Sequence, residues 1–290
     1  MWFLYALIGA FGKSYSGFFR KRLAENITGV MFIWLSYSIT LTVLTPYMFF
    51  RLDEVVDIFL SAPIVLIGAS VSVMIATLMN LEALKREELS YIAPLNAFVP
   101  IFTLVIAAVT LGENPPMVGT LGILAIFAGA YVINLRPNRV RWYDPLRHLF
   151  TNIGALLSIG VALLYAINTV FLKEATNRGF DYFVIMYAFT IIGWLMLVHV
   201  PLFQRENIKQ VLKQSKVNIA GAALSSFAGS FFHILAVGGS FASYAASIRR
   251  FDSVISVGLG WRYLSETNIK NKLIGALLMI IGAIIIALSG

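Results

Sequence analysis

The sequence predicts an all-α membrane protein of ten transmembrane helices, arranged as two inverted five-helix repeats. Three observations support this prediction: the chain is strongly apolar, it holds ten apolar stretches of spanning length, and its second half repeats part of its first. Of the 290 residues 59% are hydrophobic and 12% charged, whereas a soluble domain is about half apolar and about a quarter charged. Ten spans of about 21 residues leave too little chain for an independently folded soluble domain.

Apolar stretches bounded by charged residues mark the predicted spans. The longest polar stretches, 136–151 and 204–216, are connectors. The predicted domains are therefore a first repeat over 1–135, a connector over 136–151 and a second repeat over 152–290. We place the spans at 2–19, 29–50, 63–81, 90–111, 115–135, 152–172, 182–203, 217–239, 243–264 and 271–289.

Basic residues are distributed unevenly among the nine predicted connections. Sixteen Lys and Arg residues lie in the odd-numbered connections and three, Arg51, Lys173 and Arg178, in the even-numbered ones. The positive-inside rule then places both termini outside the cell and the odd-numbered connections in the cytosol. We expect an integral, multi-pass protein of the cell membrane.

The two halves share sequence as well as layout. A shift of 153 residues aligns residues 90–135 with 243–288 without a gap, and 12 of the 46 positions are identical, where chance gives about three or four. Five spans per half is an odd number, so the halves must enter the membrane in opposite directions. Inverted repeats in transporters place a binding site near the membrane midplane, between the halves.

Two segments carry a further set of features. These are Pro94, Pro100, Leu111-Gly112-Glu113, Gly122 and Gly129 in the first segment, and Arg249-Arg250, Ser265-Glu266 and Gly275 to Gly282 in the second. With these features the segments resemble the EamA repeats of the drug/metabolite transporter superfamily. The resemblance implies a ten-helix transporter of small metabolites, often an exporter or exchanger, without a bound cofactor. It also implies cytosolic termini, contrary to the charge count above.

Lys13 is a cation near the middle of the first predicted span. It lies roughly 17 Å along the helix from Trp2, too deep to reach either surface easily, and a charge there costs at least about 2.5 kcal/mol. Two interpretations stay open: Lys13 faces a substrate cavity, or it forms a structural ion pair with Asp252 or a bond to a carbonyl.

Arg249 and Arg250 lie inside the ninth predicted span, and Asp252 follows them. Asp252 stands three residues after Arg249 and can pair with it on one helix face, so Arg250 is expected to be the freer cation. Together with Lys13 these groups leave an excess of positive charge that an anionic substrate group would balance. The pair resembles the Lys-Arg pair with which sugar-phosphate carriers of the superfamily hold phosphate. In the alternative interpretation, the arginines reach the nearer interface and fix the span to a neighbour.

Several uncharged polar residues in the predicted spans are candidates for the same cavity. Small residues spaced by four predict close helix packing in the third, sixth and eighth spans. His233 ends one such stripe, which favours an interhelical hydrogen bond over a proton-coupling role. Glu113 and Glu266 are expected to cap the helices that follow them. The remaining candidate substrate-binding residues are Asn80, Asn96 and Asn168.

The sequence thus favours a secondary transporter of a small, anionic metabolite that works by alternating access. The alternatives are an exporter of neutral or zwitterionic compounds such as amino acids, and a non-transporting scaffold or lipid-handling protein. No phosphate-binding Gly-Lys loop, zinc-protease motif or nucleophile elbow indicates an enzyme. The chain has no cysteine, which excludes disulfides and thiolate metal sites. We expect no cofactor or metal, and as partners the substrate and the lipid bilayer but no nucleic acid.

Overall fold

The structure of the protein is a computed structural model. It describes residues 1–23, 28–86, 94–135, 141–148, 151–203, 216–264 and 269–289, and every regular element within these ranges is helical.

The first half of the chain follows the five predicted spans, with one additional helix. That helix, α3 (Leu52–Ser61), lies between the second and third spans. The other elements are α1 (Trp2–Leu23), α2 (Gly29–Met48), the 3₁₀ turn η1 (Phe49–Arg51), α4 (Pro63–Arg86), the 3₁₀ helix η2 (Pro94–Phe98), α6 (Val99–Leu111) and α7 (Met117–Asn134).

The second half follows the other five spans after a short helix in the connector, α8 (Asp144–His148). Its ninth span consists of two helices instead of one. The elements are α9 (Ile153–Asn177), α10 (Tyr182–Met196), α11 (Val200–Phe203), α13 (Lys216–Gly238), α14 (Ala242–Arg249), α15 (Phe251–Leu264) and α16 (Ile269–Ser289).

Among the described residues, seven helical segments are long and apolar enough to cross a membrane, compared with the ten spans predicted. The three exceptions have different causes. α1 carries Lys13 and several small or hydroxyl side chains, which lower its hydropathy. α10 has only 15 residues, and the ninth span is interrupted at Arg250.

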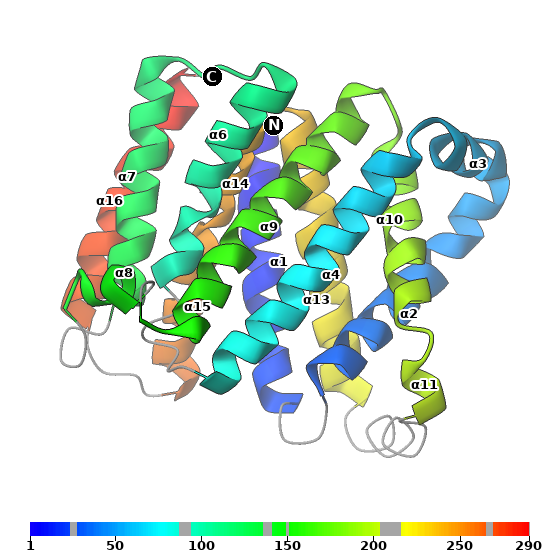
Figure 1. The fold of residues 1–290 in the computed structure, drawn as a ribbon, viewed down its shortest axis with the longest axis horizontal. Coiled ribbons are helices and arrows are strands. Elements are labelled where there is room, and N and C mark those ends of the chain that lie inside the picture. Colours follow the sequence, from blue (N-terminus) through cyan, green and yellow to red (C-terminus); the bar gives the residue numbers. More distant parts are fainter. Residues whose placement is uncertain are drawn as a thin grey trace.

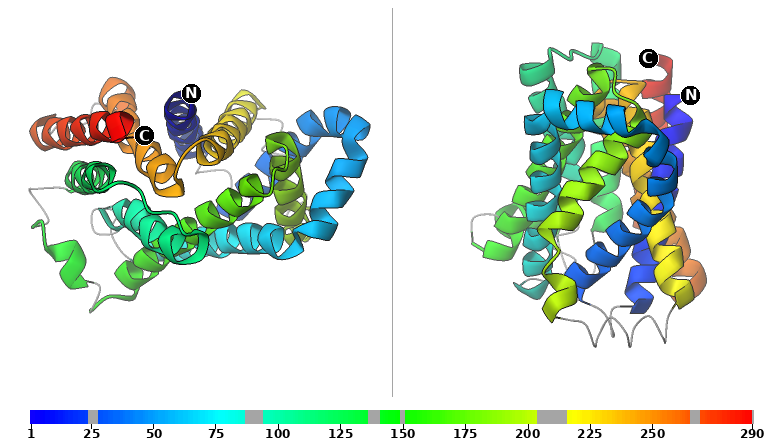
Figure 2. Two further views of the ribbon diagram at one scale, coloured as in Figure 1. Left: turned by 90° about the horizontal axis from the view of Figure 1, so that it is seen from above. Right: turned by 90° about the vertical axis from the view of Figure 1, so that its right-hand side faces the viewer.

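The helices form two rows that join at their ends (Figures 1 and 2). One row contains α16, α15 with α14, α1, α13 and α2, and the other contains α7, α6, α9, α4 and α10. The closest contacts are those of α1 with α13, of α7 with α16, and of α4 with α9. Each of these three pairs combines a helix of the first half with one of the second, so the halves are intertwined.

Glycines allow α7 and α16 to approach each other closely. A methyl group added at Gly129 would lie 2.5 Å from the backbone oxygen of Gly275, and one at Gly275 would lie 2.6 Å from that of Gly129. A methyl group added at Gly122 would lie 2.8 Å from the backbone oxygen of Gly282, and one at Gly282 would lie 2.6 Å from that of Gly122. By the 153-residue shift, Gly122 corresponds to Gly275 and Gly129 to Gly282. Exchanging the two halves therefore converts one glycine contact into the other.

The small-residue stripe of the eighth span packs against another helix, as predicted. α13 contacts α1 through Gly229, because a methyl group at Gly12 would lie 2.5 Å from the Gly229 nitrogen. On the other side of the fold, Asn168 of α9 donates a hydrogen bond of 2.8 Å to the carbonyl of Ala69 in α4. These contacts are typical of helices that pack in a membrane.

α3 lies across the ends of the spans instead of parallel to them (Figure 2). Its first turn carries Asp53 and Glu54. Its apolar residues include the exposed side chains of Val56 and Leu60. A short amphipathic helix with this placement is typical of one that lies in the membrane interface.

Both the fourth and the ninth spans are broken near mid-height. The fourth is a 3₁₀ helix up to Phe98 and an α-helix from Val99, where Pro94 and Pro100 each lack a backbone donor. The ninth breaks at Arg250, one residue from the corresponding point, although it has serines where the fourth span has prolines. Both spans are therefore broken, with prolines in only one of them.

Candidate functional site

The centre of the fold holds an ion pair between the first and ninth spans. The Nζ of Lys13 in α1 lies 2.5 Å from Oδ2 of Asp252, in the first turn of α15. The Lys13 side chain is 38% exposed and that of Asp252 13%. Ser14 donates a 2.8 Å hydrogen bond to the Asp252 backbone carbonyl. The ion pair of Lys13 with Asp252, one of the two interpretations of Lys13, is thus present. The lysine side chain is also partly accessible from outside the packed helices.

Asp252 does not pair with Arg249, contrary to the expectation from their spacing. In the described part of the chain, the Arg249 guanidinium makes neither a hydrogen bond nor an ion pair, and its Nε is buried without a partner. Helix spacing failed here because α14 ends at Arg249 and α15 begins at Phe251, so the two residues do not share one continuous helix.

Arg250 is the more constrained of the two arginines, which reverses the expectation. It is 7% exposed, and its Nη1 donates a 3.2 Å hydrogen bond to the backbone carbonyl of Asn96 in η2. Its Nε is also buried without a partner among the described residues. Arg250 therefore links the break in the ninth span to the break in the fourth.

His233 is 2% exposed on α13, where this helix contacts α1. Neither ring nitrogen has a hydrogen-bond partner within the described residues, so the predicted interhelical hydrogen bond is wrong. Unpartnered buried polar atoms are rare in native proteins. Those found here in the described side chains include atoms of His233, Arg249, Arg250 and Asp252.

The three candidate asparagines have different environments. Asn168 is buried and ties α9 to α4. Asn96 is half-buried beside the break in the fourth span, where its backbone carbonyl contacts Arg250. Asn80 is half-buried near the end of α4. Only Asn96 is in direct contact with the basic residues.

Two half-length helices begin beside the charged cluster. α6 starts at Val99 and runs toward the end that holds both termini, whereas α15 starts at Phe251 and runs the opposite way (Figure 1). Each start follows directly on another helical segment, η2 or α14, whose C-terminal end carries the opposite partial charge, so the helix ends add little net charge. The side-chain charges of Lys13, Arg249 and Arg250 therefore dominate, and Asp252 offsets only part of them. The described residues thus leave a net positive region here.

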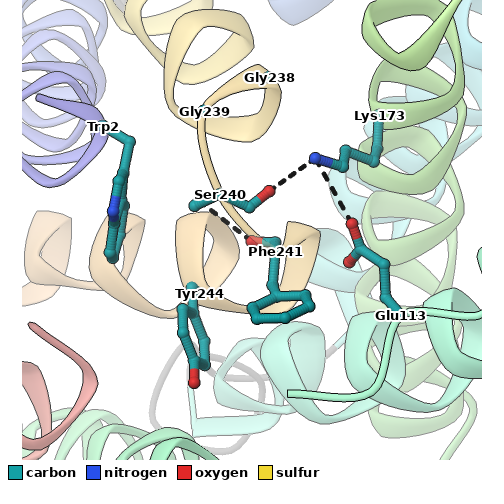
Figure 3. Close-up of a pocket in the computed structure, with 8 residues that line it drawn as sticks. All are labelled: Trp2, Glu113, Lys173, Gly238, Gly239, Ser240, Phe241 and Tyr244. Carbon is teal, nitrogen blue, oxygen red and sulfur yellow. Dashed lines mark hydrogen bonds and ion pairs between the residues drawn. The ribbon is translucent and has the colours of Figure 1, made fainter. Parts of the chain in front are cut away.

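A second polar cluster lies at the end that holds the termini (Figure 3). Lys173 of α9 donates hydrogen bonds to the carbonyls of Val237, at 3.1 Å, and Ser240, at 2.7 Å. Its Nζ also lies 3.5 Å from Oε1 of Glu113. The other oxygen of Glu113 accepts a 2.7 Å hydrogen bond from the Ala242 amide at the start of α14. This cluster joins three chain segments and satisfies both of its charged groups.

The geometry of this cluster corrects two expectations. Lys173 was counted in a connection, but it is 9% exposed inside α9, which continues to Asn177. Glu113 was expected to cap α7, the helix that follows it, and instead it caps α14. Gly112, in a left-handed conformation at φ +68°, ends α6 just before Glu113. Glu266 lies outside the described residues.

The same cluster borders a cavity of about 400 Å³. Its other lining residues include Trp2, Phe241 and Tyr244 (Figure 3). Another cavity, of about 480 Å³, lies between α2 and α10 beside Ser38, Thr42 and Trp194. Both cavities lie away from Lys13 and the arginines.

Comparisons with known proteins agree with this architecture. A search of curated proteins finds no match. One crystal structure of a protein has a TM-score of 0.69 and 15% sequence identity, over 98% of this chain and 96% of the other; at this identity the similarity concerns the fold alone. The model of the EamA-like transporter family matches residues 1–135 and 152–288. With two EamA repeats across nearly the whole chain, this integral, multi-pass membrane protein belongs to the EamA-like transporter family.

Proposed function

We propose that the protein is a secondary transporter of a small anionic metabolite, which binds among the central charges and crosses the membrane by alternating access. The observation that carries the proposal is the positive region formed by Lys13, Arg249 and Arg250, with Asp252 as the one carboxylate paired to it among the described residues. Packing alone does not compensate such an excess charge inside a membrane. A bound anion would balance it.

The proposed mechanism requires two halves related by a two-fold axis in the membrane plane, with repeats at 1–135 and 152–290 joined by 136–151. The arrangement of the rows supports it, because exchanging the equivalent spans of the two halves converts one row into the other. The reciprocal glycine contacts between α7 and α16 support it too. An approximate two-fold axis makes two alternative closures similar in energy, which alternating access needs.

We assign the direct contacts with the anion to Arg249 and Lys13. The Arg249 guanidinium has no hydrogen-bond or ion-pair partner among the described residues, and a guanidinium matches the oxygens of a carboxylate or phosphate. Lys13 is held by Asp252 and partly exposed, so a ligand could share it. Asn96 borders the same binding site, because its backbone contacts Arg250. Asn80 and Asn168 do not contact the basic residues, and we assign them to the substrate path and not to the binding site. His233, buried and unpartnered beside α1, remains a candidate for binding the substrate or coupling a proton.

Ligand-induced thermal stabilisation tests the proposal without knowledge of the substrate, since a ligand of the folded state must raise its melting temperature. The panel contains inorganic phosphate, phosphate monoesters, mono- and dicarboxylates, amino acids and neutral sugars. At about 100 times Kd, the gain corresponds to about 2.7 kcal/mol. We expect an anion to stabilise the wild type but not Arg249→Gln.

Other results would favour the alternatives. Stabilisation by amino acids or sugars alone, unchanged in Arg249→Gln, would indicate an exporter of zwitterionic or neutral compounds. If no compound stabilises a protein that is folded in detergent, and lipid alone does, a lipid-handling or scaffolding role would be favoured.

A further inference from the structure

Asn96 and Pro100 stand one helical turn apart in the broken fourth span. In a continuous α-helix the carbonyl of residue 96 accepts a hydrogen bond from the amide of residue 100. Proline has no amide hydrogen, so Pro100 cannot donate it. Pro100 is buried in the first turn of α6, a position that tolerates proline. The Asn96 carbonyl therefore lacks its α-helical donor. The 3₁₀ helix η2 offers it only the shorter-range bond from the amide three residues on, which leaves its second acceptor site open inside a membrane span, where water cannot readily fill it.

Arg250 supplies a donor to this same carbonyl. Its Nη1 lies 3.2 Å from the Asn96 oxygen, and Arg250 itself is the residue at the break between α14 and α15. At that break the backbone changes to shorter-range bonds, from the Arg250 amide to the Ser247 carbonyl and from the Ser253 amide to the Arg250 carbonyl. One side chain thus joins the two helix breaks, which belong to different halves of the chain.

We infer that Arg250 is a positioning residue: it stands in for the amide that Pro100 lacks and joins the two broken spans, which leaves Arg249 as the arginine that binds the anion. The inference deepens the proposed function and rests on it for its consequence in transport. Its structural part, the dependence of Arg250 on Pro100, can be tested independently of any substrate.

The geometry of the two adjacent arginines is consistent with separate roles, positioning for Arg250 and anion binding for Arg249. Consecutive helical residues point about 100° apart, so they cannot both face one ligand in the same way. Arg250 faces the fourth span and is nearly buried, while Arg249 makes no hydrogen bond or ion pair with any described residue. By holding Asn96, Arg250 also keeps the two helix breaks close together beside Arg249.

A double-mutant cycle measures the predicted dependence. The variants are Arg250→Gln, Pro100→Ala and their combination, with thermal unfolding of the whole protein in one detergent as the readout. Alanine at residue 100 restores an amide that can donate to the Asn96 carbonyl. We expect Arg250→Gln to lower the melting temperature by about 3 °C in the wild-type background and by less than half as much in the Pro100→Ala background. Arg250→Lys, which keeps a long side chain with donors, should recover part of the loss.

Arg249→Gln is the matched control for charge and location. It removes the neighbouring cation but no bond to Asn96, so its effect on the melting temperature should be the same in both backgrounds. Equal losses for Arg250→Gln in both backgrounds would overturn the inference, because Arg250 would then not be replacing the missing amide.

Transport kinetics in proteoliposomes separate positioning from binding. With the anion identified by the ligand panel, Arg250→Gln should lower the maximal rate at least tenfold and change KM less than twofold. Arg249→Gln should raise KM at least tenfold. A tenfold rise in KM for Arg250→Gln at an unchanged maximal rate would make Arg250 a binding residue. If the wild type transports no anion, the proposed function fails, and the thermal cycle still decides whether Arg250 depends on Pro100.

Discussion

Lys173 and Glu113 form a buried ion pair between the two halves of the chain, with Nζ and Oε1 3.5 Å apart. The lysine also binds two backbone carbonyls where α13 ends, and the glutamate binds the first amide of α14. Both side chains are about one-tenth exposed. The pair therefore holds the termini end of the fold together in this structure.

Neutralising this glutamate should destabilise the protein. Glu113→Gln removes the charge that faces Lys173 and weakens the cap on α14, and hydrogen bonds to charged groups contribute about 1.5–3 kcal/mol each. Glu174→Gln is the matched control, because Glu174 lies next to Lys173 but pairs with Arg178 in a more exposed ion pair, which is worth at most about 1 kcal/mol. Thermal unfolding should show a clear loss only for Glu113→Gln, and equal losses would contradict the structural role of the pair.

The contact between α7 and α16 predicts which glycines tolerate a methyl group. Gly129→Ala and Gly282→Ala each place a Cβ within about 2.6 Å of a backbone oxygen and should cost about 1–3 kcal/mol through overpacking. Gly258→Ala in α15 meets nothing within 4 Å and should be neutral or slightly stabilising. Gly129 and Gly282 are equivalent by the 153-residue shift, so a two-fold related contact predicts similar losses at both; a loss at only one of them would argue against that symmetry.

The charge of Asp252 should weaken anion binding. Asp252→Asn removes the negative charge and frees Lys13, so the affinity for the anion should rise by about tenfold, or about 1.4 kcal/mol. Lys13→Met should lower the affinity. The two affinities are measured by ligand-induced melting shifts at several concentrations. If Asp252→Asn binds the anion more weakly than the wild type, the carboxylate must itself hold a donor group of the substrate.

Cysteine labelling can establish the orientation in the membrane, because the chain has no native cysteine. Trp142 is exposed just before α8, at the end opposite the termini, and Asp53 is exposed on the polar face of α3 at the termini end. If the distribution of basic residues sets the topology, an impermeant maleimide added to intact cells should label Asp53→Cys and not Trp142→Cys. The reverse pattern would place the termini in the cytosol.

Much of the fold could be predicted from hydropathy, because a spanning helix needs a long apolar run and little else. α9 and α13, for example, lie where the apolar stretches are. α3 was missed because it is a ten-residue amphipathic helix with acidic residues, below spanning length. Lys173 was assigned to a connection because a charge was taken to end the span, although three acceptors from other segments satisfy it inside α9.

The sequence could predict which residues form the candidate site, but not which of them contact each other. Charges inside apolar spans identified Lys13, the two arginines and Asp252. Helical spacing describes neighbours on one helix only, so it paired Asp252 with Arg249. The ion pair of Lys13 with Asp252 was one of two open interpretations, and the choice between them depends on how α1 and α15 pack. The role of Pro100 in leaving a carbonyl for Arg250 depends on how two distant spans cross, which no local pattern specifies.

Uptake into proteoliposomes tests the central claim, transport of an anion bound by Arg249, most directly. The measurement compares the wild type, Arg249→Gln and a control, Arg178→Gln, which removes an arginine from an exposed ion pair at the end of α9. With the radiolabelled anion that stabilises the wild type, uptake should be rapid for the wild type and the control, and at least tenfold slower for Arg249→Gln at low anion concentration. Equal uptake by Arg249→Gln and the wild type, or no uptake by a folded wild type, would contradict the account.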